Sequence, residues 1–332
     1  MKETILDSNF PFTSARRTYH VALKHGEVAN RILTVGDHIR ARRIASFLDP
    51  TPKVFEFTSQ RGFTTFTGCY SGVPVSIIAI GMGYPMMDFF VREVRAVVRG
   101  ELVIIRLGSC GTLVTQIPVG HVVVSSRSLA ISTNYDFFHL SAQERAELKG
   151  TPAGSPYLIS RPIGCDKRLH DDLSEKLGKA IEGAMVFSDA LHSSADTFYG
   201  GQGRLDSNFM DHNQGLLESL SKLDEPPVTL EMETTHLFHL AAINQHTSTG
   251  PSEEPQAESF SFCQGKGAIR VAAAHITFAG RTDGKFVSRI EPSQVEQLEF
   301  QAGKGCLESL ISQHIDAVNL HPTEGSVWSC EC

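Results

Sequence analysis

The sequence predicts an α/β fold: one domain with a central mixed sheet flanked by helices. Short apolar, β-branched runs alternate with amphipathic segments, which is the pattern of βα units. The 332 residues suffice for one large core, and 41% hydrophobic with 20% charged residues is typical of a globular chain. We expect the domain to span residues 20–319, between an N-terminal extension (1–19) and a C-terminal tail (320–332).

The expected strands are short runs of apolar and β-branched residues bounded by turn residues. Ser71-Gly72 separates two such runs by two residues of a turn-forming type, which predicts a hairpin. In chain order, the expected strands are 32–35, 63–70, 73–80, 102–105, 122–124, 184–187, 228–230 and 269–278.

Helices are expected where amphipathic segments follow these strands. One runs from 37 to 48, where Asp49-Pro50 ends it because proline disfavours a helical residue before it. Another runs from 86 to 99 and ends at Gly100. A third opens at Glu231, and a long C-terminal helix is expected over 292–319. Polar stretches with Gly and Pro at about 140–160 and 247–266 predict surface insertions.

Composition excludes several functions. A net charge of -7 and a pI near 6.1 give no reason to expect nucleic acid as a partner. The start of the chain lacks a secretory signal and no apolar run is long enough for a membrane span, so we expect a cytoplasmic protein that does not bind membranes. The seven cysteines show no zinc or disulfide spacing, and Cys330-Glu331-Cys332 is interpreted as a frayed tail. No Walker or dinucleotide motif is present, which speaks against nucleoside triphosphates and NAD. We expect no metal and no cofactor.

The turn after the first strand is a candidate phosphate site. Gly36 lies at the strand-to-helix turn and Arg40 lies one helical turn later. Backbone N–H groups, the helix dipole and a guanidinium together favour an anion. The alternative is a glycine turn in which Asp37 caps the helix and Arg40 is solvated.

A second candidate anion site follows residues 102–105. We expect Arg106 at the end of this apolar strand, where burial is costly unless the arginine meets an anion, and Ser109 adds a hydroxyl. A purely structural Arg106 would need a buried carboxylate, which the sequence does not identify.

Further polar residues follow other strands. Met232 and Glu233 begin a helix, where a carboxylate either binds sugar hydroxyls or only complements the helix dipole. His236 and His239 are three residues apart on that helix, but no third metal ligand is evident. Arg281 closes the last long strand. Polar residues at several strand ends predict one pocket along one edge of the sheet.

The loop after Ser194-Ala195-Asp196-Thr197 carries a base-recognition pattern. Gln202 offers an amide and Arg204 a planar set of donors, which together match an imide edge such as that of uracil. Phe198 precedes them, and the neighbouring glycines allow a tight turn. The alternative is an ordinary Gly-rich surface turn.

Seven motifs between about His20 and Ser312 form a joint pattern. They are Gly36-Asp37-x-x-Arg40, Gln60-Arg61-Gly62-Phe63-Thr64-Thr65, Gly81-Met82-Gly83, Arg106-Leu107-Gly108-Ser109-Cys110-Gly111, Ser194 to Tyr199 with Gln202 and Arg204, Glu231-Met232-Glu233, and Arg281-Thr282. Together they resemble the nucleoside phosphorylases of the uridine phosphorylase type. The resemblance implies the nucleoside phosphorylase fold, with a partly barrel-like sheet.

The resemblance also implies a role for each matching residue. Inorganic phosphate would contact Gly36, Arg40, Arg106 and Ser109, and Arg61 from a neighbouring subunit. The ribose would contact Met232 and Glu233, with His20 of a neighbouring subunit at its 5'-hydroxyl. The base would contact Gly111, Phe198, Gln202, Arg204 and Arg281.

The activity implied by the resemblance is the phosphorolysis of uridine to uracil and ribose 1-phosphate. Arg106, Arg204 and Glu233 are the expected catalytic residues, phosphate is a co-substrate, and the shared sites require at least a homodimer. The alternatives are a purine nucleoside or methylthioadenosine phosphorylase, a hydrolytic nucleosidase, and a member of the family that binds nucleosides without catalysis. Cys110 and Gly62 depart from the pattern of relatives, and Gly62 removes a glutamate that helps some of them to hold a monovalent cation.

Overall fold

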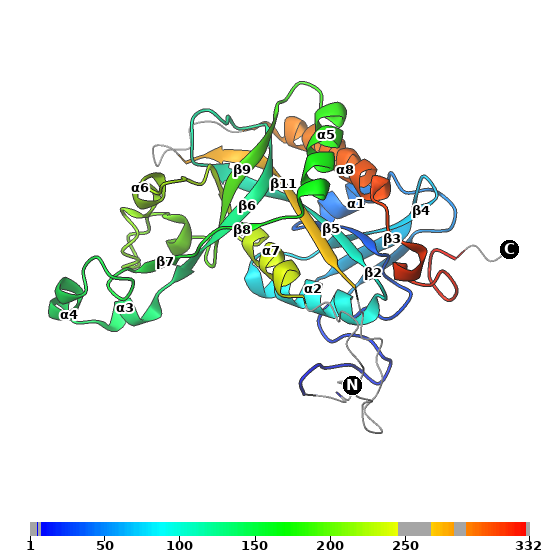
Figure 1. Ribbon diagram of the computed structural model, residues 1–332, viewed down its shortest axis with the longest axis horizontal. Helices are drawn as coiled ribbons and strands as arrows, with labels where there is room; N and C mark the ends of the chain where they lie inside the picture. Colours follow the sequence, from blue (N-terminus) through cyan, green and yellow to red (C-terminus); the bar gives the residue numbers. More distant parts are fainter. Residues whose placement is uncertain (1–4, 6–7, 245–266, 282–289, 330–332) are drawn as a thin grey trace.

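The central sheet is partly closed on itself (Figure 1). A computed structural model describes residues 5, 8–244, 267–281 and 290–329 of the chain. Strand β10 pairs with both β9 and β5, so that β5, β11, β6, β9 and β10 form a ring, while β1, β4, β3 and β2 continue outward from β5. The strands are β1 (Arg31–Val35), β2 (Phe55–Thr58), β3 (Thr64–Tyr70), β4 (Val73–Ala79), β5 (Leu102–Thr112), β6 (Val122–Thr133), β7 (Tyr157–Ile159), β8 (Ile163–Gly164), β9 (Val186–Ala195), β10 (Thr229–Glu231) and β11 (Ile269–Gly280).

Helices cover both faces of this sheet. Strand side chains alternate between the faces, so Leu33 and Val103 pack with helices α1, α5 and α8, whereas Ile32 and Ile104 pack with α2 and α7. In Figure 1, α5 and α8 lie side by side, as do α2 and α7. The helices are α1 (His38–Ala45), α2 (Tyr84–Val97), α3 (Tyr135–His139), α4 (Ala142–Glu147), α5 (Lys167–Ala180), α6 (Leu216–Ser221), α7 (Thr234–Ile243) and α8 (Pro292–Ser312), with short 3₁₀ turns at η1 (Gly200–Gln202) and η2 (Ala317–Asn319).

The predicted α/β class, the mixed sheet with its barrel-like part and the hairpin are confirmed. Ser71 and Gly72 both have positive φ, 51° and 78°, as a two-residue hairpin turn requires. Two predicted helices are too long: α1 ends at Ala45, where the chain tightens into turns, and α8 ends at Ser312. The strand predicted at 102–105 is too short, because pairing with β1 and β11 continues it to Thr112. Arg106 therefore lies inside a strand, and its prediction as a strand end is wrong.

The described parts of both terminal segments pack on the domain. Phe12 is buried, and Arg17 pairs with Glu27 at 2.6 Å. At the other end, Trp328 packs against Ala29 and Cys69. Cys330 and Cys332 lie outside the described residues, as does the insertion predicted at 247–266.

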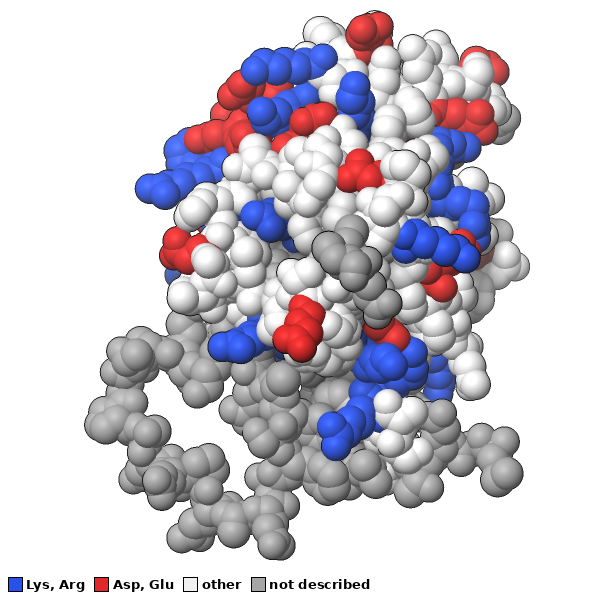
Figure 2. Space-filling model, turned by 90° about the vertical axis from the view of Figure 1, so that its right-hand side faces the viewer, with Lys and Arg blue, Asp and Glu red and all other residues white. Residues whose placement is uncertain are grey.

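The insertion predicted at 140–160 contains α4 and the edge strand β7, which pairs with β6. Tyr157 of β7 is buried and donates a hydrogen bond to the carbonyl of Asp211 at 2.9 Å. Among the described helices, none combines the length and the apolar character that a membrane span needs. On the face shown in Figure 2, basic and acidic side chains are interspersed, so the visible surface has no large area of one charge.

Candidate active site

A cavity of about 650 Å³ opens where β1, β5, β10 and β11 approach their carboxyl ends. Its wall also includes the loop after β9 and the first turn of α8. Ten of the predicted site residues line it: Gly36, Arg40, Arg106, Ser109, Gly111, Phe198, Gln202, Arg204, Met232 and Glu233. The predicted single pocket at one edge of the sheet is therefore present.

Arg40 reaches the cavity from the first turn of α1. The Asp37 side chain accepts a hydrogen bond from the backbone N–H of Ile39 at 2.9 Å, so the predicted cap is present. Arg40 itself is only 5% exposed, and the alternative of a solvated arginine is wrong. Its Nε donates to Glu299 of α8 at 2.8 Å, and Glu299 also pairs with Arg43. Sequence reasoning missed Glu299. A carboxylate on the apolar face of the last helix could have indicated that a basic residue lies opposite it.

Arg106 lies at the centre of a buried network of charges. It is 3% exposed and pairs with Glu231 at 3.0 Å and with Glu233 at a shorter distance. These are the buried carboxylates that sequence reasoning did not identify, so Arg106 has structural partners. Its Nη1 is nevertheless buried without a hydrogen-bond partner in the described chain, which leaves one strong donor for an anion.

The two glutamates differ in their protonation. Burial raises the pKa of Glu233 to about 8, because the cost of burying the charge, together with repulsion from Glu231, exceeds the opposing attraction of Arg106. Burial also opposes the charge of Glu231, but Arg106, His192 and His275 together hold the pKa of Glu231 well below its usual value. Arg106 and ionised Glu231 therefore form the fixed ion pair, while Glu233 changes its charge near neutral pH.

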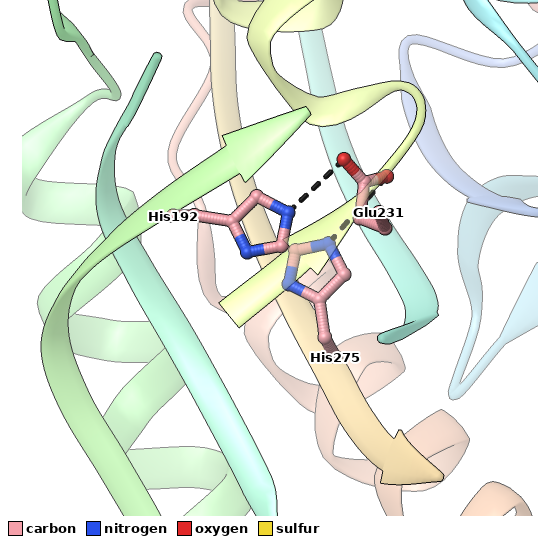
Figure 3. Close-up of side chains that lie close together, drawn as sticks. All are labelled: His192, Glu231 and His275. Atoms are coloured by element: carbon pink, nitrogen blue, oxygen red, sulfur yellow. Dashed lines mark ion pairs between the residues drawn. The ribbon is translucent and has the colours of Figure 1, made fainter. Parts of the chain in front are cut away.

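Two histidines lie beside the Glu231 carboxylate (Figure 3). His192 of β9 and His275 of β11 are fully buried, and their rings stack with centroids 4.2 Å apart. Both Nε2 atoms face the Glu231 carboxylate, at 3.0 Å and 3.9 Å. Burial holds the pKa of His275 well below its usual value, so this ring is neutral. Sequence reasoning missed the pair, although a histidine inside an otherwise apolar strand such as β11 was a signal.

The same three side chains are the group in the described chain that could hold a metal ion. Their ligand atoms lie within 4.8 Å of one another. However, Glu231 already accepts hydrogen bonds from the Ser194 hydroxyl at 2.5 Å, the Thr234 N–H at 3.0 Å and the Glu233 N–H at 2.9 Å. With the Arg106 cation on the same carboxylate, these contacts disfavour a divalent ion.

Gln202 and Arg204 form one assembled unit at the cavity wall. Gln202 is 4% exposed, and Gly203 after it adopts φ = 64°, where glycine is the favoured residue. The Arg204 guanidinium lies 4.0 Å from the Phe198 ring centroid, and its Nη2 is 3.4 Å from the Gln202 amide oxygen. The buried Gln202 rules out a simple surface turn.

Arg281, predicted to contact the base, is not among the residues that line the cavity, but it supports this unit from behind. Its Nη2 donates to the carbonyl of Gln202 at 2.8 Å. A Cβ atom on Gly111 would lie 3.0 Å from the Arg281 Cγ, so the glycine allows this approach. Burial, with Arg204 nearby, lowers the pKa of Arg281 to about 10. Thr282 lies outside the described residues.

His20 and Arg61 lie together, but away from the cavity lining. Tyr19 contacts both, with its ring 4.9 Å from the His20 ring and 5.3 Å from the Arg61 guanidinium. Glu93 of α2 holds His20, accepting from Nδ1 at 2.6 Å and from the backbone N–H at 3.0 Å, while the Phe89 ring stacks on His20 at 3.8 Å. Because these contacts use Nδ1, Nε2 is the ring nitrogen of His20 that remains for a ligand.

Comparison with known proteins matches this geometry to a family. The family described as the phosphorylase superfamily matches residues 30–249. The chain belongs to the phosphorylase superfamily. The matched region carries all the cavity residues from Gly36 to Glu233, whereas β11 and α8 lie beyond it.

Individual superfamily members extend the match. A structure from work on two diverse uridine phosphorylases in the oomycete Phytophthora capsici is 35% identical, with a TM-score of 0.78 over 94% of this chain and 100% of that chain. The uridine phosphorylase of Thermococcus kodakarensis is 28% identical over 73% of this chain and 78% of its own length. A DeoD-type purine nucleoside phosphorylase of Myxococcus xanthus is also 28% identical, over 74% of this chain and 92% of its own length. The superfamily assignment therefore covers enzymes that differ in the base.

Proposed function

We propose that this chain is a uridine phosphorylase, a pentosyltransferase that cleaves uridine with phosphate to give uracil and ribose 1-phosphate. The observation that carries the proposal is the Gln202–Arg204 unit in the same cavity as Arg106 and Glu233. An amide beside a guanidinium fits the alternating acceptors and donor of a uracil edge. Similarity to uridine phosphorylases supports the same base. The reaction belongs to pyrimidine salvage, for which we propose a cytoplasmic location.

Phosphate is the nucleophile in this mechanism. The unpaired Nη1 of Arg106, together with Arg40 and Ser109, would bind phosphate beside the ribose. Cleavage builds positive charge on the sugar, and bound phosphate stabilises this charge while it attacks the anomeric carbon. Glu233 would accept hydrogen bonds from ribose hydroxyls when it is ionised, with Met232 packing against the sugar.

The leaving base accumulates negative charge as the glycosidic bond breaks. Arg204 donates to this developing anion, and Gln202 fixes the orientation of the ring, while Phe198 packs against its face and Gly111 leaves room for it. Arg281 orients Gln202 through its backbone carbonyl. Charge placed in advance lowers the barrier without a covalent enzyme intermediate. The proposed reaction needs neither a metal nor an organic cofactor.

We further propose a homo-oligomer, at least a dimer, in which His20 and Arg61 complete the site of a neighbouring subunit. Their shared contact with Tyr19 on a surface outside the cavity lining supports this arrangement. From there, Nε2 of His20 would meet the ribose 5'-hydroxyl and Arg61 the phosphate.

The second candidate is a purine nucleoside phosphorylase, which the similarity to DeoD-type enzymes favours. The decisive experiment measures the release of free base and pentose 1-phosphate from uridine and from inosine, with and without phosphate. We expect phosphate-dependent cleavage of uridine and a much lower rate with inosine. Faster cleavage of inosine would identify the purine enzyme, and cleavage without phosphate would identify a hydrolase.

A further inference from the structure

Arg95 and His321 lie outside the cavity, and both carry buried hydrogen-bond donors without acceptors. Arg95 is on the last turn of α2, and His321 follows η2. Three of the ten buried side-chain polar atoms that lack a partner in the described chain belong to this pair: Arg95 Nε, Arg95 Nη1 and His321 Nε2. The remaining nitrogen of the guanidinium, Nη2, donates to the carbonyl of Val98.

The contacts of His321 fix its tautomer. The backbone N–H of Arg99 donates to His321 Nδ1 at 2.9 Å, so Nδ1 is an acceptor. A neutral imidazole carries its proton on the other nitrogen, which makes Nε2 a donor. All three unpaired atoms are therefore N–H donors, and the group that satisfies them must be an acceptor.

The surroundings of this pair are cationic. The His25 ring lies 4.0 Å from the His321 ring, and the positive charge of Arg99 acts on both imidazoles. None of the ion pairs among the described residues involves Arg95, Arg99, His25 or His321. Burial lowers the pKa of Arg95 to about 10, and burial with the charges of His25, Arg95 and Arg99 lowers the pKa of His321 to about 4. Arg95 is partly buried, and a partly buried cation without a counter-charge carries a desolvation cost that a bound anion offsets.

Access from solvent is available on one side. The unpaired atoms themselves have no contact with solvent in this conformation, so any ligand must displace the side chains that cover them. His25 and Arg99 are both exposed, and the His25 ring lies tilted against the His321 ring, so a change of the His25 rotamer is the movement that we expect to admit a ligand. The four residues come from the loop before β1, the end of α2 and the segment after η2, and none of them lines the catalytic cavity.

We infer that Arg95, His321, His25 and Arg99 form a second anion site, which binds a phosphate group supplied either as inorganic phosphate or by a phosphate monoester. N–H donors from an arginine and a histidine suit the oxygen atoms of a phosphate group. The inference does not depend on which base the catalytic cavity accepts.

Calorimetric titration with inorganic phosphate tests the inference, with a titration of glycerol phosphate as the second arm. We expect two phosphates per wild-type chain and one per Arg95→Met chain, while the KM for phosphate of Arg95→Met stays within about twofold of wild type. Ser109→Ala is the matched control variant. It should weaken phosphate binding in the catalytic cavity and leave the Arg95-dependent binding of phosphate unchanged. Binding of glycerol phosphate only to the Arg95-dependent site would identify a monoester as the ligand.

Stability gives an independent readout. Without anions, Arg95→Met should raise Tm, because it removes a partly buried cation that has no counter-charge. Phosphate at about 100 times its Kd should raise the Tm of wild type by about 2 °C or more through this site. His321→Asn keeps an acceptor for the Arg99 N–H but removes the Nε2 donor, so it should weaken the same binding event at least tenfold.

One phosphate per wild-type chain, or wild-type stoichiometry in both Arg95→Met and His321→Asn, would overturn the inference. Failure of the proposed function has a different signature. In that case uridine is not cleaved, while the Arg95-dependent binding of phosphate persists.

Discussion

Replacing Arg204 with alanine tests the step in which the base leaves. In the structure, Arg204 makes two internal hydrogen-bond contacts, from Nε to the Phe198 carbonyl at 3.1 Å and from Nη2 to Gln202 at 3.4 Å, and it stacks on the Phe198 ring. Its guanidinium thus retains donor capacity for a ligand in the cavity. We expect the substitution to act mainly on turnover.

The expected magnitudes follow from these contacts. A hydrogen bond to a charged group contributes about 1.5 to 3 kcal/mol, or roughly 10- to 150-fold in rate per bond. Loss of a preorganised donor to a developing anion typically slows turnover by about 10² to 10³. The lost bond to Phe198 and the lost ring contact are partly exposed, and we expect them to lower the free energy of unfolding by only about 1 kcal/mol.

Steady-state assays of uracil release, with kcat and KM determined separately, measure this effect. The matched control is Arg127→Ala, because Arg127 is an exposed arginine paired with Glu225 outside the cavity lining. 5-Fluorouridine should lose less activity than uridine in Arg204→Ala, because its more acidic base needs less stabilisation. Near-normal uridine turnover in a folded Arg204→Ala protein would refute both the mechanism and the assignment of the base.

Three further predictions concern protonation, the shared surface and packing. Because burial raises the pKa of Glu233 to about 8, the folded state retains a proton that the unfolded state loses near pH 4.5. As the pH rises from 5 to 8, the free energy of unfolding should therefore fall more steeply in wild type than in Glu233→Gln, by up to about 1.4 kcal/mol per pH unit. Denaturant titrations at several pH values measure this dependence, and the same dependence on pH in both proteins would contradict the prediction. Glu93→Gln should raise KM for uridine about tenfold by releasing His20, but should leave KM for 5'-deoxyuridine unchanged; equal effects on both substrates would indicate a structural role. Gly303→Ala should lower the free energy of unfolding by about 1 to 3 kcal/mol, because the new Cβ would lie 2.5 Å from Ile44 Cγ1. Thermal unfolding measures this loss. The control is Gly178→Ala on α5, where a Cβ would meet nothing within 4 Å.

Sequence predicted those features that depend on local chemistry. The hairpin at Ser71-Gly72 and the cap at Asp37 depend on neighbouring residues, so their patterns were sufficient. The loop with Gln202 and Arg204 was also a local motif, and its assembly at the cavity agrees with the prediction.

What sequence reasoning missed depends on contacts between distant segments. Arg106 meets Glu231 across 125 residues, and only the pairing of β10 with β5 brings the two together. His192 and His275 stack although their pairing partners on β6, Ser128 and Val123, lie five residues apart. The closure of the sheet through β10 brings the two rings together, and apolar patterns alone do not specify it. The helix and strand limits were wrong for a related reason, because pairing partners rather than local composition decided where β5 ended.

The order of segments in the ring has a consequence during protein synthesis. The residues on the phosphate side of the cavity have all been synthesised once the chain reaches residue 109. However, β11, which lies between β5 and β6 in the sheet, ends only at residue 280. Ribosomes add about 5 to 20 residues per second, so the intervening 280 − 109 = 171 residues take roughly 9 to 34 s. Throughout that interval the nascent chain exposes the edge of β5 that β11 later covers. A complete substrate pocket therefore forms only late in translation. Until then, the edge of β5 that later pairs with β11 remains unpaired.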